Sequence, residues 1–496
     1  MTLDEYLRRG VIDDLGYSPV SSSIKPVHIA NGLGRAAVGE YYDPVLLNHA
    51  LVRWAKRGAE ERHSTSEFAA EAGTRLGTLG TPAEHTKLNE LRGLLRDVMG
   101  ADDAVFDKNE YTSYTLTHKT HLTKDHNDRH TGDFLFRLLA ADLGSGPSPA
   151  LALLRRLLTD DEDEISSLAW PLTVGEPATV YELDSTDRPT SLALRSHDGK
   201  QAFRSPIARE LRSAFDRLAK FENARGSKLQ SLRRVVMLAS MAIYLHLVHR
   251  VLDLGDGRSY KSRRRPMLLD FTHGGWTQTA LASHGTYTLA VKGIEEMMVL
   301  GVRGALEQEH AQWTKRRFMQ LADSLTFQGS ASRQAQKRGQ LLDVFNSYAA
   351  ESNILDAAAY AIVDGLVDEM SGTPIDFARS LGVRSGLLAP RGNRAVKKRY
   401  APSAELLETL LVATIDIDQD LELSELADVW AERFNILIGA RSADSGDLSD
   451  WAINNATKED LTANASALRE RLIDMGYARR YADGVTVIRV GVGPRI

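Results

Sequence analysis

Apolar residues in the last hundred positions recur at the three- and four-residue steps typical of helices, and they predict three helices. The first begins at Ser403, a residue type that caps helices; the second covers 422–434; the third ends at Gly476. Two alternating strands follow around Asp483-Gly484, a dipeptide typical of hairpin turns. Three helices followed by a hairpin is the order of a winged-helix domain, which we expect over 401–496.

The chain before this region also shows mainly helical spacing. The apolar pattern predicts helices from Pro44, from about Pro82 to Met99, from Pro206 to about Val251, and through 278–380. The most apolar stretch, Val235 to Leu254, carries histidine and charged side chains, which are costly in lipid. We therefore predict a buried central helix there and no association with a membrane.

One β-like stretch stands out in the N-terminal half. Residues 178–203 alternate between apolar and polar side chains around Asp198-Gly199, which predicts a hairpin. Met267 to Phe271 reads as a further short strand. The predicted fold class is mainly α and multidomain, with a small β element near 178–203 and a C-terminal winged helix.

The chain's 496 residues are enough for about three domains. A stretch rich in Gly and Ser at 143–148 separates a predicted helical domain, 1–145, from a central, mainly helical domain with a β-hairpin, 150–383. Residues 384–400 contain basic but no acidic side chains, together with Gly and Pro, so we predict a basic linker. This linker leads to the winged-helix domain at 401–496.

Composition limits the possible chemistry. Apolar residues make up 43% and charged residues 26%, both ordinary for a globular protein. The net charge of −5 argues against wholesale wrapping of nucleic acid but allows local basic patches. The absence of cysteine excludes disulfides, thiolate zinc sites and cysteine nucleophiles, and it fits a cytoplasmic protein. No P-loop and no GxSxG motif occur, and we expect no cofactor.

Basic side chains in the C-terminal region are the candidate contacts to DNA phosphates. They lie in the linker (Arg391, Arg394, Lys397, Lys398, Arg399), on the third helix with Asn464 and Ser466 (Arg469, Arg471), and on the wing (Arg479, Arg480, Arg489). Residues 401–496 nevertheless hold 17 Asp and Glu against 9 Lys and Arg, a balance of −8. A free-standing DNA reader is usually basic, so docking onto a protein is the competing use of this domain.

The densest polar segment contains His118, His121, His126 and His130 among several aspartates. If the segment is helical, His126 and His130 share one face at the i, i+4 spacing of metal ligands. This pattern suggests a metal-dependent hydrolase or nuclease. Lysine and arginine side chains between the histidines would repel a cation, so an exposed loop or a phosphate-binding patch is the alternative.

A second candidate site follows the strand predicted at 267–271. Asp270 and His273 precede the pair Gly274-Gly275, and a helix begins near Thr277. Polar groups at the end of a strand form many α/β sites, but the same residues commonly cap helices or turns. The basic run Lys261 to Arg265 just before the strand is either a solvated loop or a second phosphate-facing patch.

Several segments resemble proteins encoded in bacterial anti-phage defence islands, beside HerA-type helicase or phosphorothioation-linked restriction genes. The resemblance covers about the last 230 residues and is carried by AELLETLLVATI, FNILIGAR, ASALRERLIDMGYARRYADGVTVIRV, PMLLDFTHGGW and APRGNRAVKKRYAPS. It implies a component of a multi-protein system acting on DNA, and it carries over no catalytic residue.

The leading hypothesis is therefore a non-catalytic, DNA-associated adaptor that docks an ATPase or nuclease partner. The metal-dependent hydrolase or nuclease remains an alternative. A winged-helix transcription regulator is the third hypothesis, although nearly 400 residues precede the domain and contain no recognisable effector site.

Overall fold

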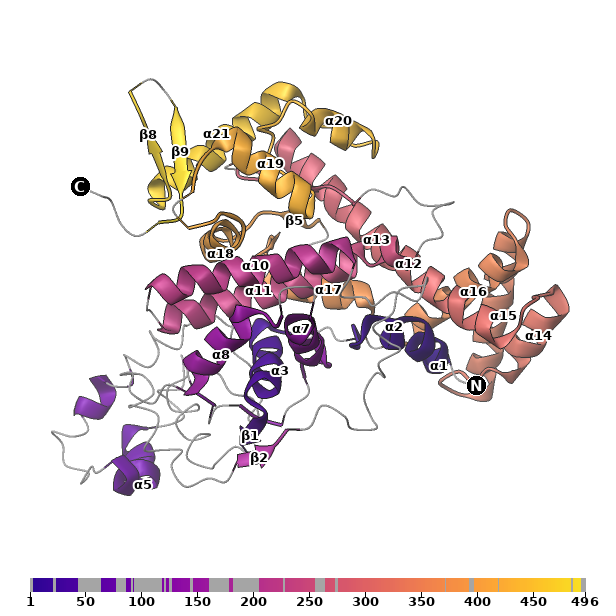
Figure 1. The fold of residues 1–496 in the computed structure, drawn as a ribbon. Helices are drawn as coiled ribbons and strands as arrows, with labels where there is room; N and C mark the ends of the chain where they lie inside the picture. The colour runs from indigo at the N-terminus through magenta and orange to yellow at the C-terminus, as the bar shows by residue number, and fades with distance from the viewer. Residues whose placement is uncertain are drawn as a thin grey trace.

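The protein is a mainly helical body with small sheets, as the hydrophobic spacing predicts (Figure 1). The computed structural model describes residues 3–20, 24–42, 64–76, 86–90, 92, 118–119, 122–124, 127–142, 146–159, 178–181, 205–225, 228–254, 264–272, 275–370, 372–391, 397–417, 419–482 and 485–491.

The N-terminal part consists of short helices around one small sheet. Its helices are α1 (Leu3–Leu7), η1 (Arg8–Ile12), α2 (Asp13–Leu15), α3 (Pro26–Val38), α5 (Thr65–Leu76), α7 (Thr131–Ala140) and α8 (Pro149–Thr159). Strand β1 (Glu40–Tyr42) pairs antiparallel with β2 (Ala178–Val180), so the described part of the predicted β element pairs with an N-terminal strand. The helix expected from Pro44 and the turn at Asp198-Gly199 lie outside the described residues.

Long helices make up the central part. They are α10 (Pro206–Arg225), α11 (Lys228–His249), α12 (Val251–Leu254), α13 (Gln278–Glu309), α14 (Lys315–Ser324), α15 (Ala331–Ala349), α16 (Ile354–Glu369) and α17 (Pro374–Arg384), with strand β3 (Met267–Leu268) before α13. The predicted helices over 206–251 and 278–380 and the short strand at 267 are confirmed. Helices α10 and α11 lie side by side through the middle of the molecule, and α14, α15 and α16 form a lobe beside them (Figure 1).

Helix α11 is the centre of the buried core. It is the helix among the described residues that is long and apolar enough to cross a membrane, and 83% of the window Gln230–His249 is buried inside the protein. It contacts α3, α10, α13, α17 and α18 (Ala404–Thr414). This burial confirms the prediction of a central core helix.

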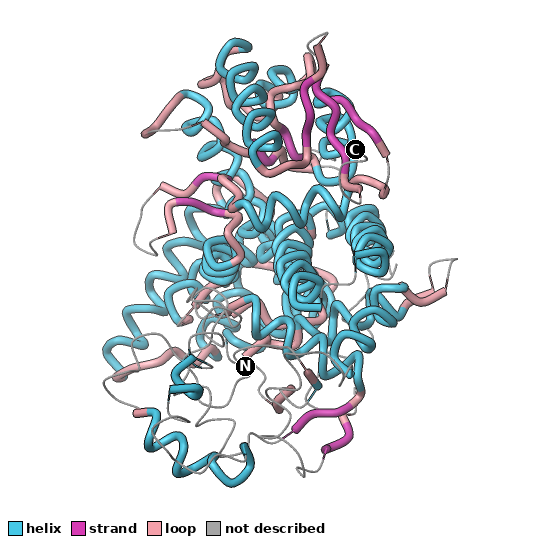
Figure 2. The backbone as a smooth tube through the Cα atoms, turned by 90° about the vertical axis from the view of Figure 1, so that its left-hand side faces the viewer, coloured by secondary structure: helices cyan, strands magenta, loops and turns pink. Residues whose placement is uncertain are grey.

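The C-terminal part alternates helices with short strands. After α18 come β6 (Asp420–Glu422), α19 (Leu423–Phe434), β7 (Ile436–Leu437), α20 (Asp444–Ser449), α21 (Lys458–Asp474), β8 (Ala478–Arg480) and β9 (Thr486–Arg489). The Ser403 side chain accepts a hydrogen bond from Leu406 N, and Gly476 ends α21 with a φ of 79°, as predicted. Strands β6, β9 and β8 form one antiparallel sheet in that order, visible at the top of Figure 2.

The large cluster of buried apolar residues contains described residues from Leu3 to Val490, and a second cluster surrounds Leu268 and Leu437. Strand β3 pairs in parallel with β7, so Met267 lies opposite Ile436, and α10 packs against α18. The large cluster contains residues from both sides of positions 145, 384 and 400, and the division into domains stays a prediction. The predicted linker contains a two-residue antiparallel ladder between β4 (Leu388–Ala389) and β5 (Arg399–Tyr400).

Two histidines on α11 are buried in this core. Tyr17 Oη lies 3.1 Å from His246 Nδ1, while His246 Nε2 and both ring nitrogens of His249 have no hydrogen-bond partner among the described residues. Burial and the nearby Arg264 and Arg265 lower the pKa of His249 to about 3. Burial also lowers the pKa of His246 well below its usual value, with Arg250 and His249 adding to this. Both rings are therefore neutral in the folded protein at physiological pH.

Stability should fall as the pH drops from about 6.5 towards 3, because the unfolded chain binds protons at these histidines and the folded chain does not. Well below pH 6.5, where the unfolded ring is protonated, each histidine contributes a slope that approaches about 1.4 kcal/mol per pH unit. Urea unfolding of His249→Phe and wild type between pH 7 and 5 measures this. We expect the variant's free energy of unfolding to be less steep with pH by about that amount. Equal slopes would contradict a buried neutral His249.

Candidate nucleic-acid interface

Two segments that the sequence marked separately meet in the structure: the end of strand β3 and the basic segment at 391–399. Asp270 N donates a hydrogen bond to Tyr400 O at 2.7 Å, and Tyr400 N donates to Ser283 Oγ at 2.9 Å. Lys398 O lies 2.7 Å from His284 Nδ1. These contacts hold strand β5 across the N-terminal end of α13, so basic side chains lie beside the residues that follow β3.

Trp276 is at the centre of this meeting point and is 43% exposed. The guanidinium carbon of Arg399 lies 5.3 Å from the centre of its ring, and Lys397 Nζ lies 5.6 Å away. The His284 ring meets the indole edge-on at 5.9 Å. We refer to Trp276, His284, Lys397 and Arg399 as the basic–aromatic patch. An exposed indole surrounded by cationic side chains is a common arrangement in nucleic-acid binding.

Asp270 fixes Arg399 in this patch. Its carboxylate Oδ2 lies 2.7 Å from Arg399 Nε, and the Asp270 side chain is buried. Asp270 Oδ1 accepts hydrogen bonds from the backbone and hydroxyl of Thr272 at 3.0 and 2.6 Å, and the Thr272 hydroxyl reaches Thr277, the N-cap of α13. The polar group at the end of the predicted strand therefore positions an arginine and a helix cap. His273 lies outside the described residues.

The His284 ring has a defined protonation pattern. Its Nδ1 faces the carbonyl oxygen of Lys398, which can only accept a hydrogen bond, so Nδ1 carries the proton. The ring is only partly buried. The indole thus has one rigid neighbour on its edge.

The predicted phosphate contacts of the basic segment differ in how far their side chains are exposed to solvent. Arg391 and Lys397 are exposed, Arg399 is partly exposed, and Arg394 lies outside the described residues. Lys398 is buried, its Nζ donates to Pro390 O at 2.6 Å, and burial together with nearby Arg379 lowers its pKa. The Lys398 side chain therefore holds the basic segment against the rest of the protein. The basic side chains of this segment that are at least partly exposed are those of Arg391, Lys397 and Arg399.

Most of the predicted arginines of the C-terminal part lie beside carboxylates. Arg489 makes contacts to both oxygens of Asp420, one of them at 2.8 Å, and Arg480 lies 2.6 Å from Glu470. Arg469 also contacts Glu470, at 3.2 Å. Arg471 is half-buried, which lowers its pKa, and Arg479 is exposed. This surface therefore presents less free positive charge than its arginines suggest.

The interpretation of Asn464 as a surface contact is wrong. Its side chain is fully buried: Oδ1 accepts from Phe271 N at 2.7 Å, while Nδ2 donates to Leu269 O at 2.8 Å and to Ile438 O at 3.0 Å. The reason is that α21 turns this face towards the end of β3 instead of towards solvent. Ser466 on the same helix is partly buried.

The histidine-rich segment is only partly described. His121 and His126 lie outside the described residues; His118 is buried, and His130 Nδ1 lies 3.1 Å from Asp133 Oδ2. Within the described ranges, no group of three His, Asp or Glu side chains is placed to hold a metal ion. The metal site at His126 and His130 stays a prediction, which metal analysis of the purified protein would test.

The described residues of the histidine-rich segment pack closely against the backbone of α3. Asp128, which is fully buried, lies 3.6 Å from Arg35 and accepts a hydrogen bond from Gly132 N at 3.0 Å. A Cβ on Gly32 would lie 2.7 Å from the Asp128 carboxyl carbon, and one on Gly132 would overlap the backbone of Gly32. Glycine is needed at position 32 because α3 and the start of α7 touch here.

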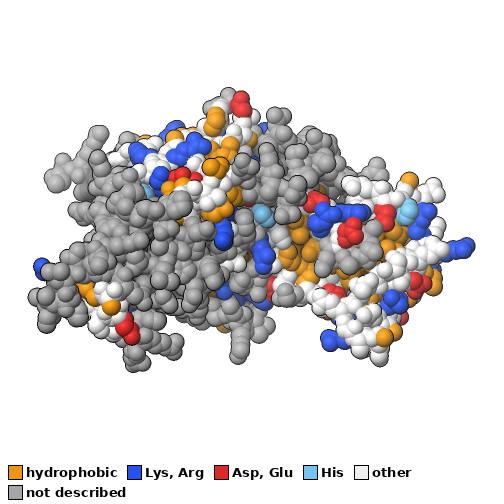
Figure 3. All heavy atoms as spheres, turned by 90° about the horizontal axis from the view of Figure 1, so that it is seen from below, with side chains coloured by type: hydrophobic (Ala, Val, Ile, Leu, Met, Phe, Trp, Pro, Cys, Tyr) orange, Lys and Arg blue, Asp and Glu red, His pale blue; other side chains and the backbone are white. Residues whose placement is uncertain are grey.

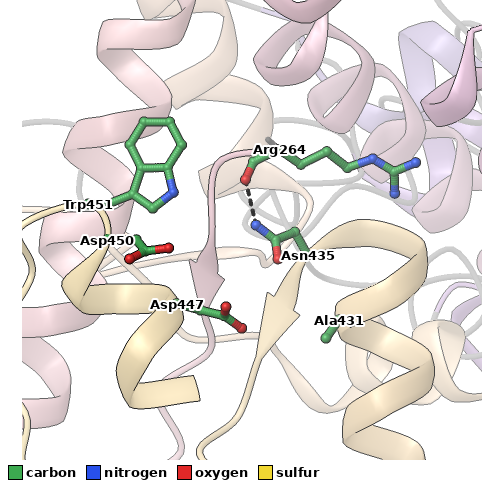
Figure 4. A pocket seen from close by; sticks show the side chains of 6 residues that line it. All are labelled: Arg264, Ala431, Asn435, Asp447, Asp450 and Trp451. Carbon is green, nitrogen blue, oxygen red and sulfur yellow. Dashed lines mark hydrogen bonds between the residues drawn. The ribbon is translucent and has the colours of Figure 1, made fainter. Parts of the chain in front are cut away.

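A cavity of about 240 Å³ lies near the other end of β3, lined by Arg264, Ala431, Asn435, Asp447, Asp450 and Trp451 (Figure 4). Asn435 Nδ2 donates to Arg264 O at 2.6 Å, and the Arg264 side chain extends away from both aspartates (Figure 4). Arg441 binds Asp447 at 2.8 Å, and the guanidinium of Arg265 lies 5.5 Å from the Trp451 ring centre. Because this charged lining is largely paired within the chain, we assign no ligand to the cavity.

The basic–aromatic patch is therefore the candidate functional surface of the described residues. On the face of the molecule shown in Figure 3, by contrast with the patch, basic and acidic side chains (blue and red) lie interspersed over the described part.

No protein-family model matches this chain, and no curated protein matches it either.

Proposed function

We propose that this protein is a non-catalytic, DNA-associated adaptor subunit that contacts DNA through the basic–aromatic patch and docks a protein partner through its C-terminal part. The observation that carries the proposal is the placement of Lys397 and Arg399 over the exposed ring of Trp276. Phosphate attraction requires positive charge near the surface, and Lys397 and Arg391 supply it.

The order of the C-terminal elements supports a winged-helix unit. Helices α18, α19 and α21 precede the β8–β9 hairpin, and β6 joins that hairpin in one antiparallel sheet. The exposed positions of α21 include Glu459, Glu470 and Asp474, which repel phosphates. This charge distribution supports the use of the unit in docking onto a protein, with DNA contact made by the nearby patch.

The partner class follows from the resemblance to defence-island proteins. It implies an ATPase or nuclease subunit of an anti-phage system, with this chain bridging that subunit and DNA. Affinity purification of the full chain from its native host, followed by mass spectrometry, tests this part of the proposal. Recovery of no ATPase or nuclease, while DNA binding is intact, would remove the adaptor role and keep the DNA contact.

Charge reversal at Arg391 and Lys397 should weaken DNA binding by roughly tenfold or more at about 0.1 M salt. Both side chains are exposed, so Arg391→Glu/Lys397→Glu leaves the buried Lys398 and the Arg399–Asp270 pair in place. Fluorescence anisotropy over a range of salt concentrations measures the effect, and we expect the salt dependence to become shallower as well.

The matched control is Lys315→Glu/Arg316→Glu, which makes the same change of charge on exposed residues of α14. These two residues lie on the lobe formed by α14, α15 and α16 (Figure 1). The affinity of this double variant for DNA should therefore stay within about twofold of wild type. An equal loss in both double variants would show that only overall charge matters, and it would overturn the assignment of the patch.

A further inference from the structure

Trp276 is held in place on several sides although its ring is exposed. Arg399, next to the indole, is fixed by the buried carboxylate of Asp270, and His284, at the indole edge, is fixed by Lys398 O. Trp276 also directly precedes Thr277, the residue that caps α13. A large aromatic side chain that is both exposed and fixed is prepared for stacking, because little side-chain entropy is lost when a flat ligand binds.

The charges around the ring restrict the ligand. Lys397 beside the ring disfavours a cationic group such as a lysine or arginine side chain of a partner and favours an anion, whereas Asp270 compensates the charge of Arg399. Lys397 is exposed and is held by no carboxylate within hydrogen-bonding distance in the described residues, so it can leave the ring at little cost and reach a phosphate. Arg399 stays, because Asp270 holds it.

A ligand that combines a flat ring with phosphate groups is a nucleotide. Whether its base is paired decides whether that base can stack on Trp276. Bases within a duplex are stacked on both faces and paired at their edges, so an indole cannot lie on them without unstacking. An unpaired base has a free face. Resting on the proposed function, we infer that the basic–aromatic patch binds an unpaired nucleotide, with its base stacked on Trp276 and a flanking phosphate on Lys397.

Binding of the full chain to a 20-nucleotide oligo(dT) and to a blunt 20-base-pair duplex, measured by anisotropy at fixed salt, tests this inference. We expect Trp276→Ala to lower affinity for oligo(dT) about tenfold, within the range measured for stacked bases, and affinity for the duplex less than twofold. The slope of affinity against salt should not change, because no charge is removed. Trp276→Phe, which keeps a ring, should retain most of the affinity.

Intrinsic fluorescence gives an independent reading. Oligo(dT) should quench the emission of the wild type and quench Trp276→Phe much less, whereas Trp313→Phe should behave as wild type, since Trp313 lies beyond α13. Equal quenching of all three proteins would overturn the stacking.

The variants separate failure of the inference from failure of the proposed function. If Arg391→Glu/Lys397→Glu weakens binding of both DNAs and Trp276→Ala changes neither, the DNA contact stands and the unpaired base is wrong. If Trp276→Ala weakens both DNAs equally, the ring supports the surface without selecting an unpaired base, which also overturns the inference. If neither variant changes DNA binding, the proposed function fails as well. If the protein binds an acidic peptide more tightly than oligo(dT), the proposed function also fails.

Discussion

Replacing Asn464 with leucine should destabilise the folded protein by about 3–5 kcal/mol. The Asn464 side chain satisfies three backbone groups: Phe271 N, Leu269 O and Ile438 O. Leucine has a similar size but offers no hydrogen bond, so all three buried groups would lose their partner at about 1–3 kcal/mol each before relaxation. Urea unfolding of the full chain at pH 7 measures the change.

Two further variants make this measurement specific. Ser466→Ala lies on the same helix at a partly buried position, and its free energy of unfolding should stay within about 0.5 kcal/mol of wild type. Asn464→Asp keeps the acceptor for Phe271 N but places a carboxylate against the carbonyl oxygens of Leu269 and Ile438, so it should be at least as destabilising as leucine. Wild-type stability of Asn464→Leu would show that α21 does not hold the end of β3.

The position of Asn464 also shows why its role could not be predicted from the sequence. Hydrophobic spacing correctly predicted the helix over 458–474 and its apolar face, since local periodicity determines both. An asparagine at the border of that face is equally compatible with solvent, DNA or the interior. The deciding contact comes from strand β3, nearly two hundred residues earlier, and no local pattern encodes that pairing.

The same limit applied to the candidate interface. The sequence marked the strand end at Asp270 and the basic segment at 391–399 as separate features, and the two segments contact each other in the structure. Trp276 could not be singled out, because an exposed and a buried tryptophan look alike without their neighbours. Lys398 was predicted as a phosphate contact because its charge is evident from the sequence, whereas its burial is evident only from the structure.

Gly301→Ala should destabilise the protein by about 3 kcal/mol, the other large effect we expect. In the structure η1 crosses α13 so closely that a Cβ on Gly301 would overlap the carbonyl oxygen of Gly10, and a Cβ on Gly10 would lie 2.6 Å from the backbone of Gly301. Both partners are backbone, so no side chain can move aside. The N-terminal helices must separate from α13 to admit a methyl group, which is the cost of overpacking.

Gly304→Ala on the same helix is the matched control. A Cβ there meets nothing within 4 Å, and alanine favours helix over glycine by about 0.5–1 kcal/mol, so this variant should be slightly more stable than wild type. Opposite signs for two Gly→Ala changes three residues apart cannot arise from helix propensity, which favours alanine at both. They require the close crossing of η1 and α13. If both variants are more stable than wild type, the N-terminal helices do not pack on α13 at Gly301, and the large apolar cluster described above begins after them.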